Sequence, residues 1–389
     1  MNIENVLELL ELRMKRSISF LPAKRRLYFE ELKKRFVSRG ILLCGPRGSG
    51  KTTFLLSIAQ EENMFYISAD DPLVGVVPFY ELSQHILSSY DGIIIDEIHF
   101  LKDWGIQLKS LYDSFPNKKI WISDSSSIML HKSIAELSRR FVIISLPLMS
   151  LREFIHFETG KILPVITDPF SSELSDISMK ILREVDVMKY FKFYKDHGTR
   201  PFYTEPNFKD RIMNIIQKSI YYDIPHIVGT LSENHFGVMN AIVSYLAYSK
   251  IPTINVESMC KEWRLSKEKL YQLLNAMGQV GLVTIVQKSL IESPYSKGAK
   301  IFFSDPVIYS ALDGEIGNFR EAFVVFALKD RGTLLAQKDE TKGDYIFNNI
   351  TLEIGGANKK RKQAQYVIRD DIDLPVRNAI PMWTLGMGW

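Results

Sequence analysis

Cysteine is nearly absent from the sequence, which has only Cys44 and Cys260 among 389 residues. Two cysteines exclude both a disulfide scaffold and a zinc site built from cysteines alone. Long apolar runs are missing too, since no segment approaches the roughly 18 uncharged apolar residues that a membrane helix needs. The first residues, MNIENVLELLELRMKRS, lack the basic start and unbroken apolar stretch of a secretory signal. We therefore expect a soluble, cytoplasmic protein with no membrane partner.

A strong excess of one charge is also missing. The chain has 49 basic and 45 acidic residues, so its formal net charge is +4. With no strong overall field, any affinity for DNA must come from local patches. The hydrophobic share of 46% and the charged share of 24% are typical of a folded globular protein, and the length favours two or three domains.

The residue pattern changes along the chain and predicts an α/β protein with four regions. Residues 1–155 begin with two helical stretches and continue with short apolar runs separated by amphipathic segments. These runs predict the strands of a parallel sheet covered on both faces, and they span residues 41–45, 64–68, 92–96, 119–123 and 141–147. Helical periodicity predicts a helical subdomain over 156–245. Residues 246–310 predict two helices and a hairpin, and residues 311–389 return to mixed α and β structure.

A phosphate-binding loop is the most specific motif in the sequence. GPRGSGKT, residues 45–52, matches G-x-x-x-x-G-K-[ST], with an apolar strand before it and a helix after it. Glycines let successive backbone N–H groups curl around a phosphate at the positive end of the helix. Lys51 is expected to reach the β- and γ-phosphates of ATP, and the Thr52 hydroxyl to bind Mg²⁺. The expected nucleotide-binding residues are Gly45, Pro46, Arg47, Gly48, Ser49, Gly50, Lys51, Thr52 and Thr53.

The acidic pair Asp96-Glu97 complements this loop. Three isoleucines precede it, so a buried strand delivers Asp96 at its carboxyl end, where it can bind Mg²⁺ together with Thr52. Glu97 can polarise a water for in-line attack on the γ-phosphate. An adjacent aspartate and glutamate favour an enzyme that hydrolyses the nucleotide over a kinase or a simple switch.

Three further positions are candidates for nucleotide contacts, and each has a plain structural alternative. After the strand at 119–123, Asp124, Ser125 or Ser126 can orient the attacking water, or else form a polar loop with a serine cap. Arg139 or Arg140 can act as an arginine finger in a neighbouring subunit, or simply end a helix favourably. Arg200 can be a lid sensor above the nucleotide, or part of an ordinary turn.

The chain resembles the predicted AAA+ ATPases of archaea and bacteria that carry a C-terminal restriction-endonuclease-like domain. The resemblance covers residues 25–210 and is carried by GPRGSGKTT (45–53), IIIDEIHFLKDW (93–104), SDSSSIML (123–130), SRRFVIISLPLMSLREF (138–154) and GTRPF (198–202). It implies a P-loop NTPase sheet with a helical lid, then a winged helix and a small nuclease-like domain. Where the family commonly has glycine, this chain has Asp124 and Arg139, so the water-orienting and finger assignments at these positions stay open.

Residues 252–303 have the pattern of a winged helix that contacts DNA. Two helices, 256–262 and 267–277, are followed by a hairpin that would form the wing. Polar side chains of the second helix are of the types that contact phosphates and bases, namely Lys267, Lys269, Tyr271, Gln272 and Asn275, and the lysines expected on the wing are Lys288, Lys297 and Lys300. The alternative is a protein-binding module with a solvated basic face.

Three carboxylates near the C-terminus follow the order found in PD-(D/E)xK nucleases. Glu321, Asp344 and Glu353 would share a divalent metal, but the lysine position of the motif is Gly355. Without that cation the transition state loses stabilisation, although Lys359, Lys360 or Lys362 can substitute for it. We expect a nuclease-like fold with degenerate, inactive chemistry.

The sequence as a whole predicts a Mg²⁺-dependent ATPase that couples its nucleotide state to a DNA-binding region. DNA contacts are expected through residues 252–303 and the C-terminal domain, and a homo-oligomer is possible. Two alternatives stay open at this point. One is a nucleotide-dependent switch that binds a protein or operator DNA with little turnover, and the other is a metal-dependent DNA nuclease.

Overall fold

The computed structural model describes residues 2–124, 137, 139–250, 253–357, 359 and 362–389. The chain divides into two compact units, Met1–Leu148 and Met149–Trp389. The division precedes the helix α7 (Leu151–Thr159), which packs against α9 (Val187–His197) in the second unit.

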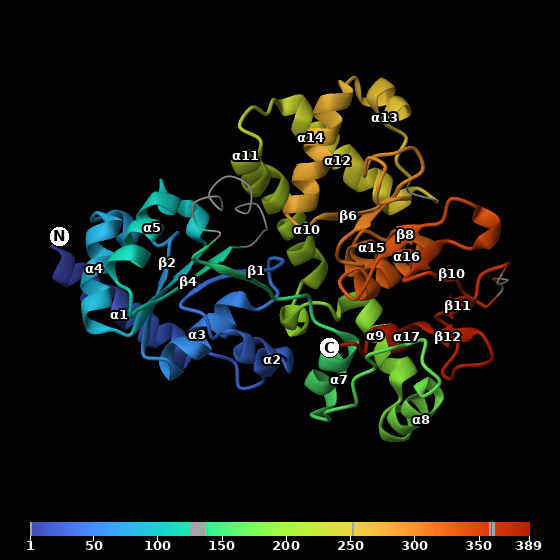
Figure 1. Cartoon of the computed structure of the whole chain (residues 1–389), viewed down its shortest axis with the longest axis horizontal. Helices are drawn as coiled ribbons and strands as arrows, with labels where there is room; N and C mark the ends of the chain where they lie inside the picture. The colour runs from blue at the N-terminus through green and yellow to red at the C-terminus, as the bar shows by residue number, and fades with distance from the viewer. Residues whose placement is uncertain (1, 125–136, 138, 251–252, 358, 360–361) are drawn as a thin grey trace. The chain divides into compact units, whose positions relative to one another are not determined.

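The first unit is built on a parallel sheet of five strands, which confirms the prediction made from the apolar runs (Figure 1). The strands are β1 (Gly40–Cys44), β2 (Met64–Ser68), β3 (Gly92–Asp96), β4 (Lys119–Asp124) and β5 (Val142–Ser145), in the spatial order β2-β3-β4-β1-β5. Strands β1 and β3 are buried along their whole length, as expected for a sheet covered on both faces. The edge strand β5 departs from this expectation, because Val142 is 49% exposed and Ile143 is 40% exposed.

Helices connect and cover these strands. They are α1 (Ile3–Ser19), α2 (Tyr28–Arg35), α3 (Lys51–Glu61), α4 (Phe79–Ser89) and α5 (Trp104–Ser114), with short 3-10 turns at Pro72–Gly75 and Ile98–Phe100. Between α3 and the sheet, the Phe36 ring meets Phe54 and Trp121 edge to face, with centroid distances of 4.8 and 5.0 Å. Such aromatic pairs add to the burial energy and fix the start of α3 against the sheet.

The second unit begins with helices. They are α7, α8 (Leu174–Glu184), α9, α10 (Phe208–Lys218), α11 (Ile224–Ile227) and α12 (Glu233–Tyr248), with a π-helical turn at Ser219–Asp223. Ser150 and Glu153 form a capping box that starts α7, since each side chain bonds the other's backbone N–H. The helical content predicted for residues 156–245 is present.

Two further helices and a hairpin follow, as the sequence predicted. Helix α13 (Val256–Trp263) and helix α14 (Lys267–Gln279) precede the antiparallel pair of β6 (Val283–Val286) and β7 (Lys300–Phe303). The Ser266 hydroxyl accepts from the N–H of Lys269 and caps α14. These elements are those of a winged helix, and that assignment remains a prediction.

A second sheet of five strands completes the unit. Its strands are β8 (Leu334–Ala336), β9 (Tyr345–Phe347), β10 (Ile350–Gly355), β11 (Tyr366–Arg369) and β12 (Ala379–Pro381), in the order β12-β11-β10-β9-β8. Strands β10, β11 and β12 run parallel, whereas β8, β9 and β10 pair antiparallel. Helix α16 (Ile316–Leu328) is buried over its second half and packs against β7, β10, the short helix α15 (Val307–Ala311) and the short helix α17 (Met382–Leu385).

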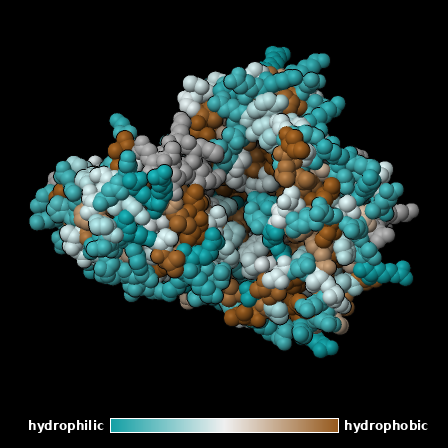
Figure 2. Space-filling view, in the orientation of Figure 1, coloured by the Kyte–Doolittle hydropathy of each residue, from teal (hydrophilic) through white to brown (hydrophobic). Residues whose placement is uncertain are grey.

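Across the part of the chain that the structure describes, no helix combines the length and the apolarity needed to cross a membrane. The face shown in Figure 2 is mostly hydrophilic, with hydrophobic residues in separate small groups. Scattered apolar side chains of this kind are normal on a protein surface.

Candidate functional site

The loop between β1 and α3 is shaped by its glycines. Gly50 has φ +99° at the start of α3, and Gly48 has φ +73°, both in the left-handed region that favours glycine. Gly45 is required for a different reason, because a Cβ there would lie 2.5 Å from the carbonyl oxygen of Leu146. The loop therefore curls tightly and leaves its backbone N–H groups at the helix start, which is the geometry that cradles a phosphate.

Lys51 lies folded over this loop. Its Nζ donates to the carbonyl oxygens of Gly45, at 2.7 Å, and Pro46, at 3.3 Å, and the residue is only 6% exposed. Burial lowers the pKa of the Lys51 ammonium, against the opposing charges of Glu97, Asp96 and Asp124. The ammonium is thus held at the loop by weak neutral acceptors, which an anionic phosphate can replace.

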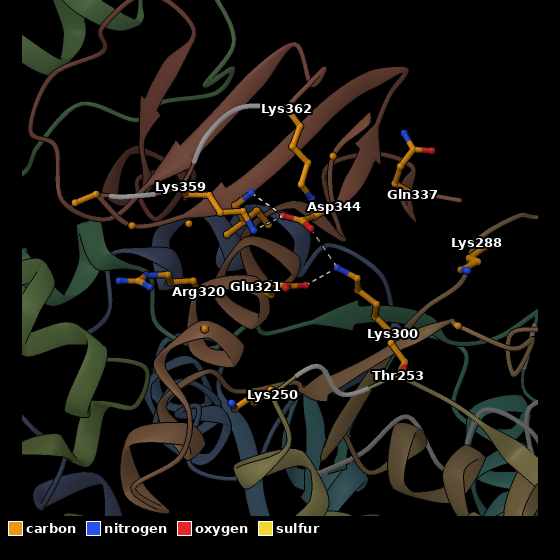
Figure 3. A pocket seen from close by; sticks show the side chains of 17 residues that line it. Lys250, Thr253, Lys288, Lys300, Arg320, Glu321, Gln337, Asp344, Lys359 and Lys362 are labelled. Atoms are coloured by element: carbon orange, nitrogen blue, oxygen red, sulfur yellow. Dashed lines mark hydrogen bonds and ion pairs between the residues drawn. The ribbon is translucent and has the colours of Figure 1, made fainter. Parts of the chain in front are cut away.

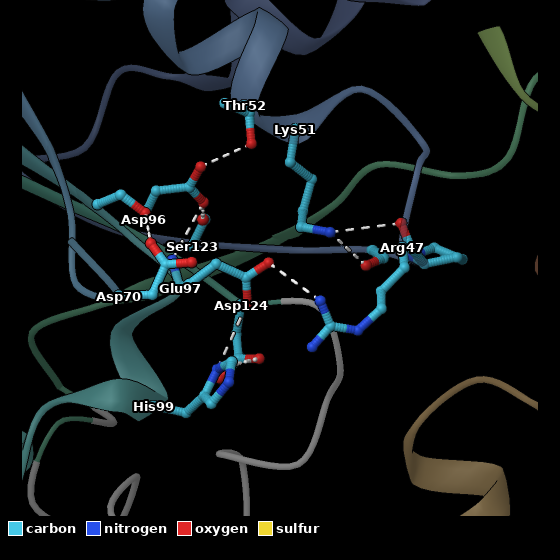
Figure 4. Close-up of polar contacts among 12 residues, drawn as sticks. Arg47, Lys51, Thr52, Asp70, Asp96, Glu97, His99, Ser123 and Asp124 are labelled. Carbon is cyan, nitrogen blue, oxygen red and sulfur yellow. Dashed lines mark hydrogen bonds and ion pairs between the residues drawn. The ribbon is translucent and has the colours of Figure 1, made fainter. Parts of the chain in front are cut away.

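Asp96, at the end of β3, gathers donors from three other elements (Figure 4). Its Oδ2 accepts from the hydroxyls of Thr52, at 2.7 Å, and Tyr66, at 2.8 Å, and its Oδ1 accepts from Ser123. The carboxylate is 2% exposed. Thr52 and Asp96 therefore bring two oxygen ligands together, which fits the hard-oxygen preference of Mg²⁺.

Glu97 follows Asp96 in the left-handed region, with φ 52°. In this conformation the Glu97 carboxylate lies 3.5 Å from Nη1 of Arg47 and 3.5 Å from Nδ1 of His99 (Figure 4). Burial raises the pKa of Glu97, and the Arg47 and Lys51 charges lower it. A raised pKa suits a group that takes a proton from water.

His99 joins Glu97 to the end of the neighbouring strand β4. Its Nδ1 lies 3.4 Å from Oδ1 of Asp124, which is 1% exposed. Among the described residues, Glu97, His99 and Asp124 are the group whose ligand atoms lie close enough together to share a metal ion. A nitrogen ligand suits Mg²⁺ less well than the all-oxygen pair of Thr52 and Asp96.

Several predicted residues lie together and others do not. Gly45 to Thr53, Asp96, Glu97 and Asp124 meet at the carboxyl ends of β1, β3 and β4. Ser125 and Ser126 fall outside the described residues. Arg140 forms a two-pronged ion pair with Asp113, with Nε and Nη2 at 2.9 and 2.8 Å.

Arg200 is buried in the second unit, beside the 3-10 turn Pro201–Thr204. It is 3% exposed, and its Nε and Nη2 both lie 2.9 Å from Oδ2 of Asp305. The sensor role proposed for Arg200 remains a prediction.

Sequence reasoning missed three residues of the site. Arg26, 3% exposed, donates to the carbonyl oxygens of Ser49, at 2.8 Å, and Pro147, at 2.7 Å, and so ties the loop to the chain after β5. Tyr66 and His99 were also missed. His99 had a signal, since it follows the acidic pair by two residues, whereas nothing in the sequence marks Arg26 or Tyr66.

The three C-terminal carboxylates come from the predicted elements but meet lysines rather than one another. Glu321 lies on α16, Asp344 precedes β9, and Glu353 is on β10. Lys300 lies on the hairpin, as predicted, but its side chain is only 14% exposed, and its Nζ lies 2.7 Å from Oε2 of Glu321 and 3.8 Å from Oδ1 of Asp344. The hairpin directs this lysine inward, where carboxylates compensate its charge.

Lys359 occupies the space beside Gly355. A Cβ on Gly355 would lie 2.3 Å from Cβ and Cγ of Lys359, and the Lys359 Nζ lies 2.8 Å from Oε1 of Glu353. Neither Lys359 nor Lys362 is in a helix. Lys359 and Lys362 lie beside Glu353, as expected of lysines that substitute for the motif lysine, but Lys300 lies between Glu321 and Asp344, so the cluster does not fit a shared divalent metal.

Comparison with known proteins adds a family to this geometry. Residues 38–155 match the family model described as an AAA domain. This stretch of the chain is thus similar to an AAA domain. The protein is therefore an ATPase, and its P-loop NTPase fold agrees with the parallel sheet and loop described above.

Solved structures similar to this chain share little sequence with it. The Walker-type ATPase PABY2304 of Pyrococcus abyssi is 13% identical, over 75% of this chain and 95% of that one, with a TM-score of 0.42. The RuvB Holliday junction branch migration motor of Thermotoga maritima is 17% identical over 78% and 95%, with a TM-score of 0.33. The Orc1 protein of Aeropyrum pernix, solved in complex with DNA, is 14% identical over 78% and 93%, with a TM-score of 0.34. Comparison with curated proteins found no match.

Proposed function

We propose that the ATPase domain binds ATP with Mg²⁺ in the loop at 45–53 and hydrolyses it with Glu97 as the general base. The observation that carries this proposal is the 2.7 Å contact between the Thr52 hydroxyl and the Asp96 carboxylate, which joins the loop to the end of β3. When bound, Mg²⁺ neutralises charge on the β- and γ-phosphates. Thr52 and Asp96 would hold it.

The surrounding residues then have distinct roles. Lys51 exchanges the carbonyl oxygens of Gly45 and Pro46 for phosphate oxygens, which bind an ammonium more strongly. Glu97 accepts a proton from the attacking water, and Asp124 with His99 keeps the Glu97 carboxylate in place. Ser125 and Arg140 remain candidates for orienting water and for stabilising charge in a neighbouring subunit.

Two substitutions test these roles. Lys51→Ala should abolish ATP binding in calorimetry, because the phosphates lose their main cation. Glu97→Gln should preserve binding but lower the hydrolysis rate at least about 100-fold, the usual contribution of a general base. The exposed Lys109 and Glu8 offer matched controls, Lys109→Ala and Glu8→Gln, which should hydrolyse ATP at the native rate. Native turnover by Glu97→Gln would end the assignment of the base.

We further propose that the nucleotide state is coupled to DNA binding through residues 252–303 and the C-terminal region. The exposure of Lys267, Gln272 and Asn275 on α14 supports this, since exposed side chains of these types can reach phosphates and base edges. A winged helix followed by a nuclease-like domain is the architecture we infer for this part of the chain.

The second candidate function is a nucleotide-dependent switch with little turnover. One observation favours it: Glu97 is held beside the cation of Arg47, so the base is restrained before nucleotide binds. Hydrolysis that stays slow with and without DNA would support the switch, whereas stimulation by DNA would support the coupled ATPase.

A further inference from the structure

The second unit contains a cavity of about 890 Å3 that is lined by basic side chains (Figure 3). Six cationic residues line it: Lys250, Lys288, Lys300, Arg320, Lys359 and Lys362. They come from the chain just after α12, the hairpin, α16 and the segment after β10. A cavity of this size falls in the range of ligand-binding pockets rather than of packing defects.

Glycines make room for three of these cations. A Cβ on Gly298 would lie 2.5 Å from Nζ of Lys288, and a Cβ on Gly356 would lie 2.7 Å from Nη2 of Arg320. A Cβ on Gly355 would likewise clash with the side chain of Lys359. These glycines therefore leave room for the basic side chains that line the cavity.

Carboxylates hold four of the cations but do not neutralise the cavity. Lys300 pairs with Glu321 and Asp344, Lys359 and Lys362 pair with Glu353, and Arg320 Nε lies 2.9 Å from Oδ2 of Asp370. Six cations against these four acids leave an excess of 6 − 4 = 2 positive charges. Lys250 and Lys288 account for that excess, since neither has a carboxylate within 4.0 Å among the described residues.

The arrangement of Lys300 argues against a metal in this cavity. Its ammonium lies between Glu321 and Asp344, where a shared divalent ion would have to sit, and 4.5 Å from the centre of the Tyr345 ring. The Tyr345 hydroxyl donates to the same Glu321 oxygen at 2.7 Å. The lysine and the tyrosine thus already satisfy the carboxylate that a metal would require.

We propose that this cavity binds the phosphate backbone of an unpaired nucleic-acid strand, without a divalent metal. Fixed cations from several elements suit a ligand that carries several phosphates in a row, as a strand does. Among the described lining residues none is aromatic, so the cavity has no stacking platform for bases and recognises phosphates regardless of sequence. The choice of nucleic acid rests on the proposed function, because the hairpin that supplies Lys288 and Lys300 belongs to the region proposed to bind DNA.

The test uses the full-length protein without nucleotide and a fluorescent single-stranded 20-mer, in buffer containing EDTA. Lys250 and Lys288 are the residues to change first, because neither forms an ion pair with a residue that the structure describes, so their loss leaves none of those carboxylates without its partner. The double variant Lys250→Gln/Lys288→Gln should bind about tenfold or more weakly by anisotropy, and the slope of log K against log salt should fall by about two, one for each lysine. The control is Lys180→Gln/Lys189→Gln, which removes the same charge from exposed lysines of α8 and α9 and should bind as the native protein does.

Each other outcome overturns the inference in a recognisable way. Unchanged affinity and salt slope in Lys250→Gln/Lys288→Gln, with weaker binding in Lys267→Gln, would place the strand on α14 alone and leave the proposed DNA binding intact. Binding that requires Mn²⁺ and is lost in Asp344→Asn, or cleavage of the strand, would make the cavity a metal site. Tight binding of inorganic triphosphate without binding of the 20-mer would replace the strand by a small phosphate compound. Failure of ATP hydrolysis would appear in a separate assay and leave this result untouched.

Discussion

Asp96 and Glu321 are both carboxylates in polar clusters, but their neighbours differ in charge. Asp96 accepts hydrogen bonds from hydroxyls of Thr52, Tyr66 and Ser123, none of which neutralises its charge. Glu321 has the ammonium of Lys300 at 2.7 Å. A divalent cation can add to the first arrangement, whereas it must displace a protein cation in the second. A carboxylate in the first unit can therefore accept a metal, whereas the one in the second unit already binds a lysine.

Arg47 is expected to lower the pKa of Glu97, the proposed general base. Its charge lowers the pKa of Glu97 and so opposes the effect of burial. In Arg47→Ala that pKa should rise further, so Glu97 becomes protonated at higher pH and the acid limb of the kcat profile should move upward. A rise of one unit would lower kcat about tenfold on that limb, and raising the pH would restore it. The measurement is kcat against pH from 5 to 9.

Arg47→Lys serves as the control for this prediction, because it keeps the charge and should keep the native profile. If Arg47→Ala raised only the KM for ATP and left the pH profile unchanged, Arg47 would act on the nucleotide and not on Glu97.

At the scale of elements, short segments between helices and strands carry the functional groups. The loop before α3, the ends of β3 and β4 and the chain after β5 meet because the strands of a parallel sheet end at the same edge. A second example lies outside that sheet. Thr199 and Arg200 precede a 3-10 turn, and both contact Asp305, which lies shortly before α15. The Thr199 hydroxyl donates to Oδ1 of Asp305 at 2.9 Å, so the acid accepts from both neighbours.

The Arg200–Asp305 pair should stabilise the second unit. Arg200→Met would leave Asp305 charged and buried, which costs about 3–5 kcal/mol in the free energy of unfolding. Urea denaturation should show the loss. The exposed pair of Arg211 and Glu205 provides the control, since Arg211→Met should change stability by less than about 1 kcal/mol. Native stability combined with a raised KM for ATP in Arg200→Met would instead establish the sensor role.

At the scale of the whole molecule, the question is whether the two units communicate. We expect single-stranded DNA to raise the ATP hydrolysis rate several-fold, because binding to the second unit shifts the population of states in which the base is free. Steady-state rates with single-stranded, duplex and branched DNA measure this. Gel filtration with a non-hydrolysable nucleotide shows whether copies assemble, which is the condition for Arg140 to act in trans.

Rates that no DNA alters would favour the switch over the coupled ATPase. A monomer under all nucleotide conditions would remove Arg140 from the reaction and leave it as the partner of Asp113.

The parallel sheet, the phosphate loop and the pair Asp96-Glu97 could all be predicted from the residues alone. Their signals are local: an apolar run makes a buried strand, glycines permit a tight turn, and residues that end a strand lie at the sheet edge. The predicted α14 and its Ser266 cap were equally local and are present in the structure. Such features need only neighbours within a few positions of the chain.

The distant side chains that complete each site become apparent from the packing of the folded chain. Arg26 meets the loop 23 residues away, Tyr66 meets Asp96 across 30 residues, and Lys300 meets Glu321 across 21. No periodicity or motif encodes these pairings, because they depend on how separate elements pack. The inward turn of Lys300 changes the C-terminal cluster from a metal site into a cavity of positive charge, and the cost of burying an ammonium without a carboxylate beside it is the physical reason that this lysine and these acids meet.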